Sequence, residues 1–129
     1  MKIKVTTIYV DDQEKALAFY TDMLGFAKKN DFGNESYRWL TVVPSEDPEG
    51  VELQLASNAN PIGKAFQEAT FQSGQPAIQF FTDDVKADYE RIKAKGVAFR
   101  MAPTDVTAST IAQLDDTCGN IVQITQLNW

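Results

Sequence analysis

Histidine is absent from this chain of 129 residues, and cysteine occurs once, as Cys118. Without histidine, the chain cannot form a Ser–His–Asp triad, a Cys–His pair or a metal site with imidazole ligands. One cysteine cannot form an internal disulfide, so we expect a reducing, cytoplasmic compartment. Asp115 and Asp116 precede Cys118 and disfavour the thiolate that a nucleophile needs, so we expect a turn residue there.

Long apolar runs and clusters of basic residues are also missing. No stretch is long and apolar enough to span a bilayer, and residues 1–4 lead directly into a strand. We therefore expect neither a membrane anchor nor a signal peptide. Asp and Glu number 18 against 12 Lys and Arg, which gives a formal net charge of −6. Nucleic acids and anionic membranes would repel such a surface, so we expect neither as a partner.

The composition that remains is typical of a globular protein, with 43% hydrophobic and 23% charged residues. A chain of this length can bury about two thirds of its unfolded surface. We therefore expect a single domain over residues 1–129.

The most informative stretch lies at residues 3–26. Alternating side chains at residues 3–10 predict a strand. Asp11 or Asp12 can then accept a hydrogen bond from the first free amide groups of a helix. Gly25 is placed to end that helix with a positive φ, and Phe26 begins the next strand. The apolar face of the predicted helix consists of Ala16, Leu17, Tyr20, Met23 and Leu24.

The second half of the chain repeats the first. Asp83–Asp84 follows Asp11–Asp12 at an offset of 72, and Gln123–Ile124 follows Glu52–Leu53 at an offset of 71. Gly96 is placed to end a second helix. The order of elements predicts an α+β fold of two βαβββ modules, at residues 1–57 and 76–129, joined by a connector at 58–75. Further strands are predicted at residues 26–32, 37–43, 51–55, 97–101, 110–114 and 121–125.

Four segments of the first module and one near the C-terminus carry a resemblance to a known family. They are Val10–Asp12, Lys15–Leu17, Phe19–Tyr20, Leu24–Phe26 and Asp116–Ile124. With these segments the chain resembles the vicinal oxygen chelate superfamily, the glyoxalase, bleomycin-resistance and ring-cleaving dioxygenase group. The resemblance implies that the two modules curl into an open, mixed β-sheet. It also implies a homodimer, and it leaves activity open because the superfamily includes enzymes and binding proteins.

The resemblance places metal ligands at four positions, two on the first strands and two on the last strands of the modules. In this chain they are Val5, Ala77, Glu52 and Gln123. One carboxylate and one neutral amide cannot hold a divalent ion tightly. We therefore expect no metal and no other cofactor, which disfavours glyoxalase-type isomerisation and extradiol ring cleavage.

The same strands predict a ligand pocket on one face of the sheet. Its expected lining residues are Thr7, Tyr9, Tyr37, Trp39, Glu52, Gln54, Gln79 and Gln123. Polar residues at every second position of a strand are usually solvent-facing, and Trp39 could equally pack in the core. The opposite face, with Val10, Leu53, Leu55, Ile78, Phe80 and Ile124, should pack under the helices.

Three functions remain open at this point. The first is a metal-independent protein, similar to the bleomycin-resistance branch, that binds a drug or metabolite in a dimer cleft and thereby sequesters it. The second is an enzyme, lyase, isomerase or dioxygenase-like, with Glu52 as general base, because burial without a metal would raise the pKa of Glu52. The third is a regulatory domain with a filled, ligandless barrel. The connector could cover the pocket as a lid or pin a loop to the surface through Phe66 and Phe71.

Overall fold

Eight strands and three α-helices make up the fold in the computed structural model, which describes residues 1–129. The chain divides into an N-terminal unit, Met1–Gln67, and a C-terminal unit, Glu68–Trp129. The N-terminal unit contains β1 (Val5–Val10), α1 (Gln13–Ala18), a π-helical turn η1 (Phe19–Met23), β2 (Phe26–Asn34), β3 (Tyr37–Pro44) and β4 (Glu52–Ser57). The C-terminal unit contains β5 (Ile78–Phe81), α3 (Val85–Ala94), β6 (Phe99–Val106), β7 (Ser109–Asp115) and β8 (Ile121–Leu127). Helix α2 (Pro61–Gln72) crosses the boundary between the units.

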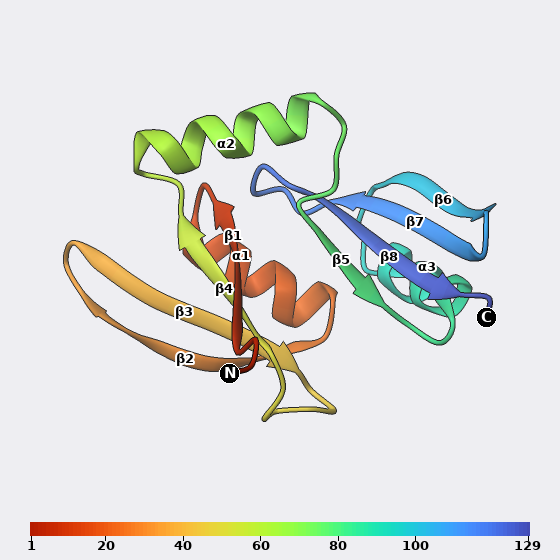
Figure 1. Ribbon diagram of the computed structural model, residues 1–129, viewed down its shortest axis with the longest axis horizontal. Coiled ribbons are helices and arrows are strands. Elements are labelled where there is room, and N and C mark those ends of the chain that lie inside the picture. Colours follow the sequence, from red (N-terminus) through yellow and green to blue (C-terminus); the bar gives the residue numbers. More distant parts are fainter. The chain divides into compact units, whose positions relative to one another are not determined.

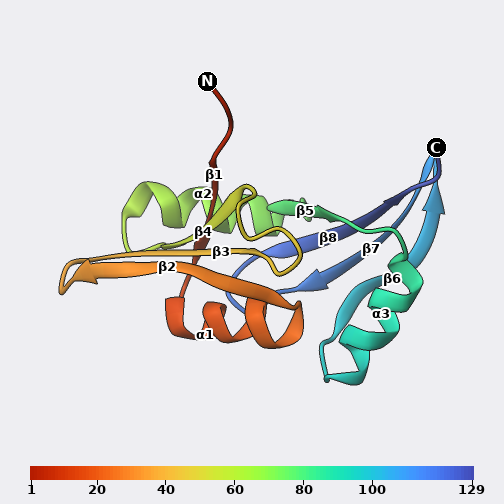
Figure 2. The same cartoon turned by 90° about the horizontal axis from the view of Figure 1, so that it is seen from below.

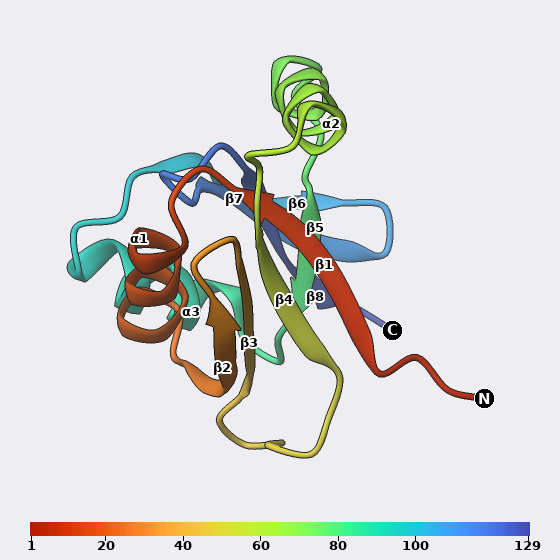
Figure 3. The same ribbon diagram turned by 90° about the vertical axis from the view of Figure 1, so that its left-hand side faces the viewer.

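Each unit contains one four-stranded mixed sheet, in the order β1-β4-β3-β2 and β5-β8-β7-β6 (Figure 1). In both sheets the first strand of the unit pairs in parallel with the last, and the other neighbours are antiparallel. The four strands of the N-terminal sheet are seen side by side in Figure 3. This arrangement confirms the predicted α+β fold with a βαβββ order in each half.

One helix covers one face of each sheet. Figure 2 shows α1 along the N-terminal sheet, with its axis beneath the strands. The covered face of that sheet is apolar and buried, as the alternation of side chains along β1, β3 and β4 requires. Its side chains are Ile8, Val10, Leu40, Val42, Leu53 and Leu55. In the C-terminal unit, α3 packs Val85 and Ile92 in the same way, over Ala112, Leu114, Val122 and Ile124. The opposite face of each sheet is the one that carries the polar side chains.

The helix boundaries follow the sequence prediction. Asp12 accepts a hydrogen bond from the Lys15 amide at 3.1 Å, and Asp84 accepts one from the Ala87 amide at 3.0 Å. These bonds satisfy amide groups that have no partner within the first turn of a helix. Gly25 and Gly96 follow the helices with φ angles of 87° and 94°, a conformation that glycine adopts without steric cost.

The apolar face of the first helix differs from the predicted one at Phe19. After Ala18 the helix widens into the π-turn η1, in which the Leu24 amide donates to the Phe19 carbonyl five residues earlier. The wider turn allows two consecutive residues, Phe19 and Tyr20, to be buried, with ring centroids 5.4 Å apart. A regular 3.6-residue period cannot predict this.

The sequence offset predicted that Gln123 is equivalent to Glu52, but the strand pairing shows a different equivalence. Thr7 lies opposite Gln54 in the N-terminal sheet, and Gln79 lies opposite Gln123 in the C-terminal sheet. Thr7 and Gln79 precede the equivalent capping residues by the same distance, so Gln123 corresponds to Gln54. The reason is that the paired positions are 47 residues apart in the first sheet and 44 in the second.

The connector contains a helix of 12 residues, α2, from Pro61 to Gln72. None of the helices has the length and apolar character needed to cross a lipid bilayer.

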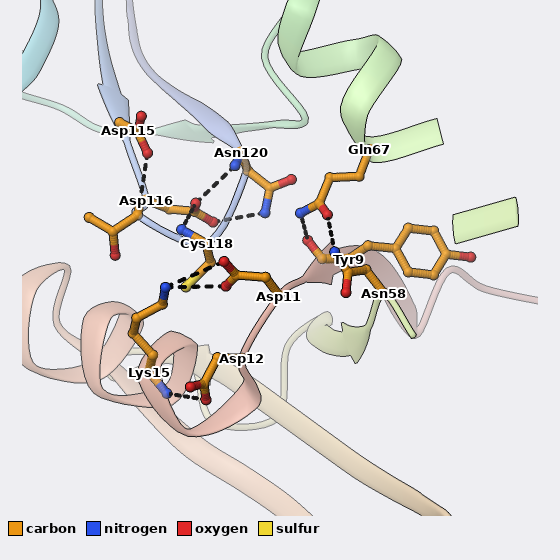
Figure 4. Close-up of polar contacts among 11 residues, drawn as sticks. Tyr9, Asp11, Asp12, Lys15, Asn58, Gln67, Asp115, Asp116, Cys118 and Asn120 are labelled. Atoms are coloured by element: carbon orange, nitrogen blue, oxygen red, sulfur yellow. Dashed lines mark hydrogen bonds and ion pairs between the residues drawn. The ribbon is translucent and has the colours of Figure 1, made fainter. Parts of the chain in front are cut away.

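The turn between β7 and β8 is held by a buried carboxylate, that of Asp116 (Figure 4). Asp116 accepts hydrogen bonds from the amides of Cys118 at 2.7 Å and Asn120 at 2.9 Å, and from the Asn120 side chain at 2.8 Å. Thr117 adopts a φ of 63° in this turn, and Cys118 is fully buried. The carboxylate therefore satisfies three donors in a turn that includes a strained residue.

We expect Asp116→Ala to lower the free energy of unfolding by about 3 kcal/mol, because it leaves buried donors without an acceptor. Urea denaturation followed by circular dichroism measures this loss. Asp115→Ala is the matched control, since the Asp115 carboxylate accepts from one backbone amide, that of Thr117, and is more exposed. The control should cost about 1 kcal/mol or less. Equal losses in the two variants would show that the Asp116 bonds do not hold the turn.

Candidate functional site

Strands β3 and β4 part at one end of the N-terminal sheet. Their register contains two pairs, Thr41 with Gln54 and Val42 with Leu53. Beyond Gln54 the two strands continue, as far as Ser57 on β4 and back to Tyr37 on β3, without further pairing. The neighbouring β1–β4 and β2–β3 ladders run to the ends of their strands. The sheet is therefore open only between β3 and β4, beyond Gln54.

A cavity of about 700 Å³ lies at this opening. Its volume falls in the range of pockets that hold small organic molecules. The walls come from β1, β4, the β2–β3 hairpin and the segment that leads into α2. The lining residues are Thr7, Tyr9, Gln13, Asn34, Glu35, Ser36, Tyr37, Arg38, Gln54, Ala56, Ser57, Ala59 and Asn60.

Gln13, the first residue of α1, bridges the two parted strands. Its Nε2 donates to the carbonyl oxygen of Arg38 on β3 at 3.1 Å and to that of Leu55 on β4 at 2.9 Å. The strands do not pair at this point, so the Gln13 amide supplies the hydrogen bonds that the Arg38 and Leu55 carbonyls would receive in a continuous ladder. The residue that follows the capping aspartate in the C-terminal unit is the buried Val85. There β7 and β8 pair along their whole length, so no bridging amide is required.

A chain of hydrogen bonds crosses the cavity wall from β1 to β3. Thr7 Oγ1 donates to Gln54 Oε1 at 2.8 Å, and Gln54 Nε2 donates to the Tyr37 hydroxyl oxygen at 3.3 Å. Gln54 is 9% exposed, whereas Tyr37 is 54% exposed. The buried amide therefore joins a residue of the first strand to an aromatic ring at the cavity mouth.

Side-chain hydrogen bonds hold helix α2 beside Tyr9 (Figure 4). Gln67 Nε2 donates to the Tyr9 carbonyl at 2.7 Å, and Asn58 Nδ2 donates to Gln67 Oε1 at 2.7 Å. A Cβ atom at Gly63 would lie 2.7 Å from the Tyr9 ring, so only glycine allows this close approach. These contacts hold the start of the connector against β1.

The charges at the cavity mouth are unequally paired. Arg38 donates two hydrogen bonds of 2.8 Å to the Asp31 carboxylate and also pairs with Glu14. The hydrogen bond from Arg38 is the main cause that lowers the pKa of Asp31 from 3.8 to about 2. Glu35, in contrast, lines the cavity and forms no ion pair. The free charge at the mouth is negative.

Glu52 lies outside the cavity and differs from expectation in its acidity. Its Oε1 accepts from the hydroxyl of Thr41 and from Asn30 Nδ2, each at 2.7 Å, while Lys4 Nζ lies 3.8 Å from Oε2. The Thr41 hydrogen bond, followed by the bond from Asn30, lowers the pKa of Glu52 although burial opposes this. The expected rise in pKa was wrong, because neighbouring donors stabilise the carboxylate. A carboxylate stabilised in this way is a weak proton acceptor.

The residues present do not suit the metal that the resembled fold often carries. Val5, opposite Glu52, offers no donor atom, and Glu52 Oε1 already accepts two hydrogen bonds. No three His, Cys, Asp or Glu side chains lie together as a metal site would require.

The structure brings four of the eight predicted site residues to the cavity, namely Thr7, Tyr9, Tyr37 and Gln54. Trp39 lies on the same strand as Tyr37 but pairs with Phe32 outside the lining. Gln79 and Gln123 belong to the C-terminal sheet, where Gln123 Nε2 donates to Gln79 Oε1 at 3.0 Å. A third amide, that of Gln113, donates to Gln123 Oε1 at 3.0 Å.

Sequence reasoning missed nine of the residues that line the cavity. They are Gln13, Asn34, Glu35, Ser36, Arg38, Ala56, Ser57, Ala59 and Asn60. A polar residue directly after a helix cap is common on exposed helices, so nothing in the pattern marked Gln13. Asn34 to Ser36 lie between the strands predicted at residues 26–32 and 37–43, and the composition of a hairpin loop does not indicate a ligand wall.

Comparisons with known proteins agree with this fold. The sequence profile of the family described as Glyoxalase/Bleomycin resistance protein/Dioxygenase superfamily matches residues 2–124. YurT of Bacillus subtilis (strain 168), described as uncharacterized, is 48% identical over 126 residues, which cover 98% of this chain and 99% of YurT. The solved structure of UcmS2 is 32% identical, with a TM-score of 0.83 and 97% of each chain covered. TnmS3, described as an antibiotic binding protein from Streptomyces sp. CB03234, is 27% identical, with a TM-score of 0.78, and the match covers 98% of this chain and 96% of TnmS3.

We expect Gln13→Ala to lower the free energy of unfolding by about 1–2 kcal/mol, because two strand carbonyls lose their donor at a partly hydrated site. Gln13→Glu should be at least as destabilising, since a carboxylate cannot donate to either carbonyl. Urea denaturation of both variants measures the loss. Gln72→Ala, at an exposed position near the end of α2, is the control and should change stability by less than about 0.5 kcal/mol. If Gln13→Ala leaves the free energy of unfolding unchanged, the bridging role is contradicted.

Glu52 predicts a specific dependence of stability on pH. Because its folded pKa lies below the ordinary value of 4.5, its stabilisation is complete above that pH and is lost as the pH falls through the folded pKa. Wild type should therefore exceed Glu52→Gln in stability at pH 7, and the advantage should shrink below pH 4.5. Urea midpoints of both proteins from pH 7 to pH 3 test this. An advantage that grows on acidification would indicate a raised pKa instead.

Proposed function

We propose that this chain, which belongs to the Glyoxalase/Bleomycin resistance protein/Dioxygenase superfamily, binds a small organic molecule in the cavity between β3 and β4. The observation that carries the proposal is the parting of these strands around a cavity of about 700 Å³. Gln13 donates hydrogen bonds to the strand carbonyls at the opening, so the cavity does not depend on a ligand to exist. A preformed cavity favours binding because little ordering is required.

The lining supports a drug-like or metabolite-like ligand. Two tyrosine rings, Tyr9 and Tyr37, offer flat apolar surface, and Gln54 and Thr7 add fixed polar groups. Pockets for small molecules combine these features. The similarity to TnmS3, an antibiotic binding protein, supports the same class of ligand. Sequestration of a drug or metabolite would follow from binding without turnover.

We further propose that binding is independent of metal. The cavity wall supplies one unpaired carboxylate, that of Glu35, and no imidazole or thiolate. The alternative, an enzyme with Glu52 as general base, is weakened by the lowered pKa of that residue and by its position outside the cavity. A homodimer with clefts between subunits, a cytoplasmic location and a lid over residues 58–75 stay predictions.

The proposal is tested by screening a library of aromatic and heteroaromatic fragments by saturation-transfer NMR, with 1 mM EDTA present. We expect wild type to bind some fragments, and Ala59→Trp to weaken their binding by about tenfold or more, because the indole would occupy part of the cavity. Ala59 is exposed and lines the cavity, so the substitution should spare the core.

Ala94→Trp, at an exposed position on α3, is the matched control and should bind the same fragments as wild type. Fragments that bind equally well to all three proteins would place the binding elsewhere and contradict the proposal. Binding that is lost in EDTA and restored by a divalent ion would contradict metal independence.

A further inference from the structure

We infer that the ligand of this cavity carries a carbonyl or similar oxygen acceptor, which takes a hydrogen bond from the Tyr37 hydroxyl. The inference rests on the proposed binding function and adds the chemical class of the ligand. It depends on the direction of the hydrogen bonds from Thr7 through Gln54 to Tyr37, because each bond in the chain decides what the next group can offer.

The direction begins at Thr7. Its single hydroxyl proton is donated to Gln54 Oε1 at 2.8 Å, an ordinary distance for a bond from a hydroxyl group. The side chain of Gln54 is thereby oriented with its NH₂ group toward β3. Gln54 is 9% exposed, so the amide has little water with which to exchange these partners.

The chain ends at Tyr37. Gln54 Nε2 donates to the phenolic oxygen at 3.3 Å, so that oxygen acts as an acceptor and its own proton is not directed to Gln54. The Tyr37 hydroxyl makes no other hydrogen bond, and the residue is 54% exposed and lines the cavity. The phenol therefore presents a donor toward the space that a ligand would fill.

Three other donors near the mouth are already engaged within the protein. Gln13 Nε2 is already bound to the carbonyls of Arg38 and Leu55. The Ser36 hydroxyl donates to Asn34 Oδ1 at 2.8 Å. Arg38 is held by Asp31 and Glu14. Glu35 adds a negative charge that favours a neutral or cationic ligand.

A pair of probes that differ by one carbonyl group tests the inference. 2-(Aminomethyl)-9-fluorenone and 2-(aminomethyl)fluorene are flat, cationic and of nearly equal size, and only the first accepts a hydrogen bond at the ring. We expect wild type to bind the fluorenone about fivefold more tightly, the ordinary worth of one hydrogen bond between neutral groups. Isothermal titration calorimetry or ligand-detected NMR gives both dissociation constants.

Two variants separate hydrogen bonding from packing. Tyr37→Phe should reduce the affinity ratio to about one, because it removes the donor and retains the ring. Gln54→Glu should do the same, since a carboxylate accepts the Tyr37 proton and withdraws it from the ligand. The matched control Tyr89→Phe lies on α3, outside the cavity lining, and should leave the ratio unchanged.

Each remaining outcome counts against the inference in a recognisable way. If wild type binds both probes equally, or if Tyr37→Phe weakens both equally, the hydroxyl makes no bond to the ligand and the inference is wrong, while the binding function stands. If wild type binds neither probe, and the fragment screen also finds no ligand, the proposed function itself fails and the inference fails with it.

Discussion

Two hydrogen bonds from a single amide group, that of Gln13, allow the N-terminal sheet to open without leaving its backbone unpaired. An isolated strand carbonyl inside a protein costs free energy, so adjacent strands normally stay paired along their length. Here the amide meets one carbonyl from β3 and one from β4, and the strands can separate around a cavity. The C-terminal sheet has no such amide at the equivalent residue, Val85, and its strands remain paired.

The polar face of the N-terminal sheet is ordered by the same requirement that buried polar groups find partners. No buried side-chain nitrogen or oxygen lacks one. At one end of the face, Glu52 Oε1 accepts hydrogen bonds from Thr41 and Asn30, which lower the pKa of Glu52 and make it a weaker base. Nearer the cavity, Gln54 is also occupied, but the chain that it continues ends on the exposed Tyr37. Glu52 and Gln54 on β4 thus have different roles. Glu52 stabilises the sheet, and Gln54 orients the Tyr37 side chain at the cavity.

Much of the fold could be predicted from the sequence because it depends on local rules. Asp12 and Asp84 cap helices, Gly25 ends one, and alternation assigned the apolar faces correctly. The cavity depends on distant contacts instead. A helix residue, Gln13, bonds to two strands that lie far away in sequence, and no periodic pattern records such a pairing.

The errors have the same origin. The predicted pKa of Glu52 considered burial and not the donors on β2 and β3, which only the folded sheet brings near. The equivalence of Gln123 with Glu52 relied on a constant offset, whereas strand register is set by loop length as well as by repeat length. Phe19 entered the core through a π-turn that has no reliable sequence signature.

The central claim is that the space between β3 and β4 is where this protein holds its ligand. The most direct measurement is ¹⁵N–¹H chemical-shift mapping of the labelled chain of 129 residues during titration with 2-(aminomethyl)-9-fluorenone. The account predicts that the largest shifts cluster at backbone amides of the cavity lining, such as those of Tyr37, Gln54 and Ser57. Shifts concentrated instead on the C-terminal unit, with the amides of β3 and β4 unaffected, would contradict it.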